Sequence, residues 1–179
     1  MASADLSTTA VFDLTSFTQR YAAAWNACDL EAMAGMLTED IVWADPALPE
    51  PARGIAAVQE FMRSSFETFP DLRFGEPDEP HLSVAGELVA WAWTMRGTMR
   101  GPADPPGFAP TGRTMHVEGV DLWQMRDGRI ARYRAFYDTT DLARQLGIMP
   151  PRGSTAERAT VAMQRLQARL RRRKPGPRR

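Results

Sequence analysis

The sequence predicts one α+β domain, with helices first and a curved, mostly antiparallel sheet after them. Apolar residues recur at helical spacing three times before Pro70, and beyond it the pattern changes to alternating apolar and polar residues. A chain of 179 residues is enough for one domain with a substantial core. Three helices packed across a cone-shaped sheet would enclose a cavity, which is the preferred setting for a small-molecule site.

The first two helices are expected before residue 40. The first runs from Leu14 to Cys28, and Asp29 can cap a short second one that continues to Leu37. The inward stripe of the first helix comprises Phe17, Tyr21, Ala24, Trp25 and Cys28.

A short strand and a third helix come next. The strand covers residues 41–45 and is stopped by Pro46, and Gly54 opens the third helix after a proline-rich loop. The inward residues of this helix are Val58, Phe61, Met62 and Phe66.

The remaining strands follow from alternation after Pro70. Two long strands flank a loop over residues 101–113, whose length and many prolines and glycines indicate a lid or rim rather than a hairpin turn. The expected strands contain Leu72 with Phe74, Leu82 with Val84, residues 88–99, residues 114–125 and residues 130–137, with turns at 85–87 and at Asp127-Gly128.

The turn at Asp127-Gly128 decides which way Asp121 points, because side chains alternate along a strand. A tight two-residue turn would pair Asp121 with Arg134 at the surface. A type I turn with a bulge at Gly128 would instead pair Asp121 with Tyr133 and place it inside. We favour the bulge, which leaves Arg132 and Arg134 on the outer face.

Composition excludes several classes of site. The single cysteine, Cys28, rules out an internal disulfide, and His81 and His116 have no metal-binding spacing, so we expect neither a metal nor a cofactor. No apolar stretch approaches the roughly 20 residues that cross a bilayer, and no leader is visible, so we expect a cytoplasmic protein without membrane contact.

Charge separates the body from the end of the chain. From residue 152 onward there are ten Lys and Arg and one acid, which gives this segment about +9 and the body about −9. A helical pattern begins after Ser154, and residues 154–157 match the capping-box motif. We expect a flexible N-terminus over residues 1–12, the domain over 13–148, and a basic, helical or disordered tail over 149–179. Such a tail is typically solvated, and we do not expect nucleic acid as a partner.

Three polar residues occupy positions where apolar ones are expected, and they are the candidate catalytic set. Tyr21 lies on a helix stripe, Asp45 ends a strand, and Asp121 stands between Val120 and Leu122. Burial raises the pKa of a carboxyl group in apolar surroundings. The set therefore suggests proton transfer next to a carbonyl.

The same residues resemble a known family. Three segments are similar to the bacterial ketosteroid isomerases (steroid delta-isomerases), which are members of the nuclear transport factor two-like and SnoaL-like superfamily. These segments are Gln19-Arg20-Tyr21 with the turn at 26–30, the loop Asp45-Pro46 with 50–61, and Gly112-Arg113 followed by Val120-Asp121. The resemblance covers about residues 14–140.

The resemblance implies a division of roles. Asp45 would be the general base, and Tyr21 and a protonated Asp121 would form the oxyanion hole; ketosteroid isomerase is itself the standard example of this pairing. It also implies an apolar steroid, terpenoid or polyketide-like substrate, and a homodimer formed through the outer sheet face near Val120, Leu122, Arg132 and Arg134. The substrate-binding residues are expected to be Trp25, Trp43, Phe61, Phe66, Trp93, Met95 and Tyr133.

The end of the domain suggests alternatives. Residues 138–147 resemble the SnoaL-like polyketide cyclases, in which, as in the limonene epoxide hydrolases, an essential aspartate lies on the last strand. Counting back from Gln145 places Ala135 at that position. The isomerase is therefore our main hypothesis, with a cyclase, an epoxide hydrolase or a non-catalytic binding module on the same scaffold as alternatives.

Overall fold

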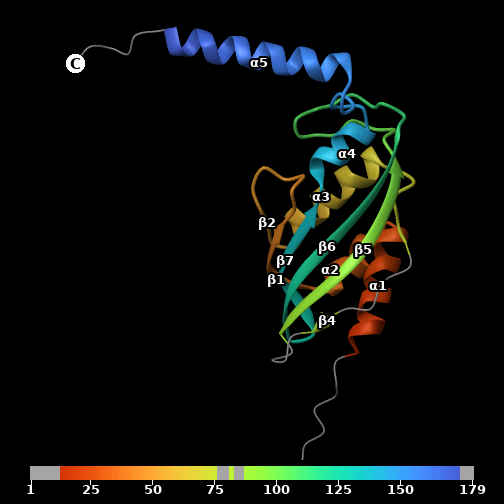
Figure 1. The fold of residues 1–179 in the computed structure, drawn as a ribbon. Coiled ribbons are helices and arrows are strands. Elements are labelled where there is room, and N and C mark those ends of the chain that lie inside the picture. The colour runs from red at the N-terminus through yellow and green to blue at the C-terminus, as the bar shows by residue number, and fades with distance from the viewer. Residues whose placement is uncertain (1–12, 76–80, 83–86, 174–179) are drawn as a thin grey trace, which may run out of the picture.

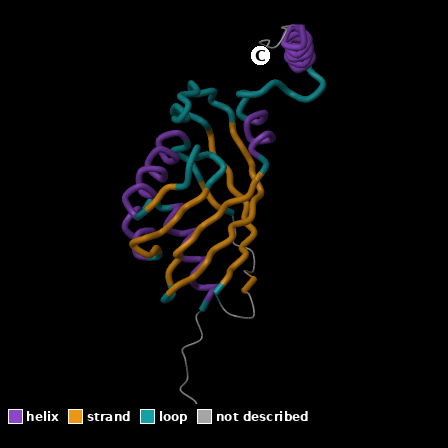
Figure 2. Tube along the Cα trace, turned by 90° about the vertical axis from the view of Figure 1, so that its left-hand side faces the viewer, coloured by secondary structure: helices purple, strands orange, loops and turns teal. Residues whose placement is uncertain are grey.

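The structure is a computed structural model that describes residues 13–75, 81–82 and 87–173. The expected flexible N-terminus, Val84 and most of the turn at 85–87 lie outside the described residues. The architecture is the predicted one: helices lie along one face of a curved sheet (Figures 1 and 2).

The second and third helices begin at the predicted residues. The side chain of Asp29 accepts hydrogen bonds from the backbone N–H groups of Glu31 and Ala32, and Gly54 precedes the third helix with a φ of 78°. The bounds are α1 (Leu14–Asn26), α2 (Leu30–Gly35) and α3 (Ile55–Thr68).

One residue of the predicted helix stripe is placed differently. Cys28 does not continue the buried stripe but is exposed, because the chain reverses there with a φ of 55° to enter α2. The first strand also begins earlier than predicted, at Leu37, because that residue pairs with Ile130.

The sheet has the strand order β2-β1-β7-β6-β5-β3, with β4 pairing with β5. All described pairs are antiparallel except β1 with β7, so the sheet is mostly antiparallel, as predicted. The strands are β1 (Leu37–Ala44), β2 (Ala52–Arg53), β3 (Arg73–Phe74), β4 (His81–Leu82), β5 (Leu88–Thr98), β6 (Thr114–Arg126) and β7 (Arg129–Tyr137).

The β6–β7 hairpin confirms the inward face of Asp121 but not the register behind that prediction. The turn is the tight two-residue form, with positive φ at both Asp127 and Gly128. The register then shifts by one residue between Gln124 and Met125, where β7 carries an extra residue at Ala131. Asp121 therefore pairs with Ala135, not with Tyr133 or Arg134. Because this register differs from the predicted one by two residues, the face is unchanged.

The C-terminal elements are α4 (Thr139–Gln145) and α5 (Thr155–Arg173). The Gln145 amide pairs with the backbone of His116, accepting from its N–H at 2.7 Å and donating to its carbonyl at 2.9 Å, which fixes α4 against β6. Ser154 caps α5, which points away from the body (Figure 1). Across the described part of the chain, we find no helix whose length and hydropathy would allow it to cross a membrane.

Candidate active site

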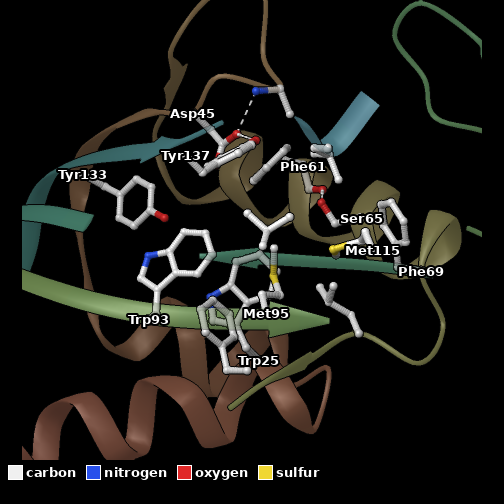
Figure 3. Close-up of a pocket in the computed structure, with 15 residues that line it drawn as sticks. Trp25, Asp45, Phe61, Ser65, Phe69, Trp93, Met95, Met115, Tyr133 and Tyr137 are labelled. Atoms are coloured by element: carbon white, nitrogen blue, oxygen red, sulfur yellow. Dashed lines mark hydrogen bonds between the residues drawn. The ribbon is translucent and has the colours of Figure 1, made fainter. Parts of the chain in front are cut away.

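A pocket of about 110 Å³ lies between the helices and the concave face of the sheet (Figure 3). Helices α1, α3 and α4, strands β3, β5, β6 and β7, and the loop after β1 all contribute to its wall. Apolar surface dominates the lining, which comprises Trp25, Asp45, Ala47, Phe61, Ser65, Phe69, Leu72, Phe74, Trp93, Met95, Met115, Val117, Tyr133, Tyr137 and Leu142.

Asp45 is the only acidic residue among the described residues that line the pocket. It follows directly after β1, and its Oδ1 accepts hydrogen bonds from the Ala47 backbone N–H and the Tyr137 hydroxyl, both at 2.8 Å. Burial raises the pKa of Asp45, while these two hydrogen bonds oppose the rise. No hydrogen bond among the described residues engages Oδ2, so this oxygen can accept a proton.

Asp121 lies behind the pocket wall and is completely buried. Its Oδ1 accepts hydrogen bonds from the Trp93 indole N–H at 2.7 Å and from the Tyr133 hydroxyl at 2.9 Å. Oδ2 is buried without a hydrogen-bond partner. Desolvation raises the pKa of Asp121 to about 7, against the effect of the two donated hydrogen bonds.

Tyr21 is also completely buried and does not line the pocket. Its hydroxyl has no hydrogen bond of ordinary geometry among the described residues, although Trp25 and Tyr133 lie near enough to lower its pKa. Its ring packs against Trp91 and Trp123 at centroid distances of 5.5 and 4.9 Å. Burial and the nearby Asp121 charge raise the pKa of Tyr21 well above its usual value. The phenol therefore stays neutral.

The three predicted catalytic residues are thus brought into one region but not onto one surface. The charges of Asp45 and Asp121 raise the pKa of Tyr21, and the charge of Asp45 raises that of Asp121, yet only Asp45 reaches the pocket. Trp93 and Tyr133 line the pocket in front of Asp121, and both donate their hydrogen bonds to it.

Most of the predicted binding residues line the pocket, but two do not. Trp43 is fully buried and stacks on Tyr133 with ring centroids 3.5 Å apart. Phe66 packs edge-on against Trp25 on the helix side. Those that do line it are Trp25, Phe61, Trp93, Met95 and Tyr133.

Tyr137 is the functional candidate that the predicted site set omitted. Alternation along β7 places Tyr137 on the inner face with Tyr133, and this was the signal available in the sequence. Its contact with Asp45 joins residues 92 positions apart, which no local pattern reveals.

Comparison with known proteins assigns the family. A family model described as SnoaL-like polyketide cyclase matches residues 15–146. The chain belongs to this family. This match supports membership of the SnoaL-like family and does not support membership of the ketosteroid isomerases. The resemblance of residues 138–147 to the SnoaL-like cyclases therefore predicted the family better than the resemblance of the first half of the chain to the isomerases.

Solved structures of SnoaL-like and related proteins share this fold. TsrD from Streptomyces laurentii is 25% identical, with a TM-score of 0.65 over 76% of this chain and 96% of that chain. A proposed polyketide cyclase from Pseudomonas putida is 23% identical, with a TM-score of 0.66 over 74% of this chain and 96% of that one. IdmH, a proposed polyketide cyclase from Streptomyces antibioticus, is 23% identical, with a TM-score of 0.60 over 75% and 99%.

Proposed function

We propose that this SnoaL-like chain is an enzyme that removes a proton next to a carbonyl of a compact, polyketide-like substrate, with Asp45 as the general base. The observation that carries the proposal is the position of Asp45 in an apolar pocket. Within the described part of the chain it is the single carboxylate of the lining, with hydrogen bonds to one oxygen and none to the other. Burial raises the pKa of Asp45 and so makes it a stronger base than an exposed aspartate.

The chemistry of ring closure follows from this arrangement. Asp45 Oδ2 takes a proton from the carbon between two carbonyls, and the electron pair of that C–H bond forms an enolate. The enolate carbon attacks a third carbonyl carbon, farther along the same molecule, and a C–C bond forms as the π bond of that carbonyl breaks. The oxygen of the third carbonyl takes the proton that Asp45 had removed and becomes a hydroxyl, which returns Asp45 to its ionised form. Asp45 serves as the base because the last-strand position that carries the aspartate of related cyclases is Ala135 here.

The size of the pocket restricts the substrate. A volume of about 110 Å³ is below the roughly 300–1,000 Å³ of most ligand sites. A cavity of ~150 Å³ holds a single benzene ring. The pocket is smaller than this, so we propose a substrate that inserts no more than one flat ring at its reacting end, with Phe61 and Met95 moving to admit it.

Steroid-type isomerisation is the second candidate, because Tyr21, Asp45 and Asp121 match the isomerase pattern in order. It shares the first step and differs in the second: Asp45 returns its proton to a more distant carbon. The epoxide hydrolase alternative is weaker, because Ala135 leaves its catalytic position without a carboxylate.

The test begins with the shared step. An aryl β-diketone is incubated with the protein in deuterated water, and loss of the signal of the proton between the carbonyls is followed by NMR. We expect the unmodified protein to exchange this proton faster than protein-free buffer does, and Asp45→Asn to show only the buffer rate. Asp138→Asn is the matched control, because Asp138 caps α4 outside the pocket and asparagine can retain that role.

The outcomes separate the candidates. Equal exchange by Asp45→Asn and the unmodified protein would remove Asp45 from the mechanism. Binding of the diketone without exchange would favour a non-catalytic binding module. A rise in ultraviolet absorption with a β,γ-unsaturated ketosteroid, but no exchange of the diketone, would favour isomerisation.

We also propose that the chain forms a homodimer through the outer sheet face. Val120 and Phe136 form a cross-strand pair on that face and are 38% and 48% exposed. Exposed apolar pairs of this kind on a sheet commonly mark an interface. Light scattering of the unmodified protein and of Phe136→Lys would test this, with a dimer expected only for the former.

A further inference from the structure

We propose that the Trp93 indole N–H and the Tyr133 hydroxyl form an oxyanion-binding subsite in the pocket, with Asp121 as the positioning residue behind them. Both side chains line the pocket, and both donate to the same oxygen of Asp121. Two donors that share one acceptor atom are neighbours, so they can also meet on one ligand oxygen.

The surrounding structure fixes each donor. Trp93 pairs with Gly119 across β5 and β6, and a Cβ at Gly119 would lie 2.3 Å from the Trp93 ring. Only glycine therefore lets the indole lie flat against β6 and reach Asp121. Tyr133 is held by the stacked ring of Trp43, whose plane differs from that of Tyr133 by 8°. Both donors are thus held in place before any ligand binds.

The pocket position of these donors suits the proposed reaction. Figure 3 shows Trp93 and Tyr133 close together on one side of the pocket, beside Asp45 and Tyr137. A flat ring in the pocket could place its carbonyl oxygen at Trp93 and Tyr133 while Asp45 reaches the adjacent carbon. This inference rests on the proposed function for its role in turnover, but anion binding at the subsite can be measured without turnover.

The charge of Asp121 controls the availability of the donors. Ionised Asp121 is a strong acceptor that keeps both donors and repels an anion. Protonated Asp121 is a weaker acceptor and carries no charge, so the Tyr133 hydroxyl can rotate about its C–O bond toward a ligand oxygen. The Trp93 N–H, whose direction the held ring fixes, shares its hydrogen between Asp121 and that oxygen. The polar groups that face Asp121 are Trp93 from β5, Tyr133 from β7, Tyr21 from α1 and Trp123 from β6, and the charge of Asp45 at the end of β1 also acts on it.

The ligand class is a flat ring that carries a delocalised oxyanion, such as an enolate or a phenolate. Bound anion favours the protonated form of Asp121. Because burial raises the pKa of Asp121 to about 7, anion affinity should be highest below this pH and fall above it. The limiting fall is tenfold per pH unit, which corresponds to uptake of one proton.

The experiment uses the full chain and 2,4-dinitrophenol, which stays ionised between about pH 6 and 9, with 1,3-dinitrobenzene as a neutral probe of the same shape. We expect Trp93→Phe and Tyr133→Phe each to weaken dinitrophenolate binding by roughly ten- to hundredfold, the value of a hydrogen bond to a charged group. Neither should change dinitrobenzene binding by more than about twofold.

Trp91→Phe is the matched control. Trp91 lies on the same strand and face as Trp93 and is fully buried, but its indole N–H has no partner and does not line the pocket. We expect it to leave dinitrophenolate affinity unchanged. Equal losses for Trp91→Phe and Trp93→Phe would overturn the subsite.

Asp121→Asn tests the positioning role. We expect dinitrophenolate affinity to lose its dependence on pH near 7, while Asp45→Asn retains that dependence and the ability to bind. If only Asp45→Asn removed the pH dependence of dinitrophenolate affinity, the role of Asp121 would be overturned. If Asp121→Asn does not fold, Gly119→Ala replaces it, because it displaces the Trp93 ring from Asp121 without removing any polar group. Loss of α-proton exchange with intact anion binding would count against the proposed function and not against the subsite.

Discussion

The end of β1 and the middle of β6 each place one carboxylate near the same pocket, and the two environments are opposite. Asp45 is half-buried, borders the pocket, and is held by a loop N–H and by Tyr137. Asp121 is completely buried, lies behind Trp93 and Tyr133, and has one oxygen without a partner. Desolvation raises the pKa of both carboxyl groups, and it raises that of Asp121 to about 7.

This difference assigns different chemistry to two identical side chains. A carboxylate that reaches the pocket can exchange a proton with a substrate carbon. A carboxylate behind the wall can act only through the donors that it holds. Access to the pocket, rather than burial alone, therefore separates the proposed base from the proposed positioning residue.

Neutralising each carboxylate in turn is expected to have the largest effect. We expect Asp45→Asn to lower kcat for α-proton removal by about 10²–10⁴, the usual contribution of a general base. Asp121→Asn should retain measurable turnover, because it leaves the base in place. A larger loss in Asp121→Asn, measured on the same substrate, would exchange the two roles.

Stability should also separate the two regions. The pKa of Asp121 rises on folding from 3.8 to about 7, so the folded state holds this proton more tightly. The resulting stabilisation is complete below about pH 4 and is lost as pH rises to about 7, with an upper limit of ~4 kcal/mol. Urea unfolding at about pH 4.5 and 8 should show a smaller pH difference for Asp121→Asn than for the unmodified chain. An unchanged difference would mean that Asp121 does not titrate in this range.

A smaller effect is expected at Tyr137. Its hydroxyl donates to Asp45 and lowers the pKa of that carboxyl, so Tyr137→Phe should raise it further. Because the base must be ionised, the acid side of the pH–rate profile should move to higher pH. We expect a loss of about tenfold or less on the acid side and little loss at high pH. A uniform loss at every pH would indicate that Tyr137 contacts the substrate instead.

Asp138 provides the smallest expected effect and a reference for the other two carboxylates. It is exposed and caps α4 through the N–H groups of Thr140 and Asp141. Asp138→Ala should cost about 1 kcal/mol of unfolding free energy, and Asp138→Asn almost nothing. Neither should affect kcat. A loss of turnover in Asp138→Asn would mean that Asp138, which directly follows β7, takes part in the reaction.

Local patterns predicted much of the site's surroundings. Helical spacing placed Tyr21 and Trp25 on the buried side of α1, and alternation placed Tyr133, Ala135 and Tyr137 on the inner face of β7. The register of the hairpin was wrong by two residues, since a tight turn and a bulge at Ala131 both contribute to it. Such a bulge has no distinctive residue pattern, and the inner face was preserved because side chains alternate with a period of two.

The fold class, the cap of α2, the start of α3 and the inward direction of Asp121 could be predicted, because each depends on spacing or on a few neighbouring residues. The polar groups that meet the pocket could not, because they are brought there by long-range packing. Trp93 crosses Gly119 to cover Asp121, and Tyr137 reaches Asp45 from a strand 92 residues away. Depth within a core is set by the packing of distant side chains, and a periodic pattern gives the direction of a residue but not what lies in front of it.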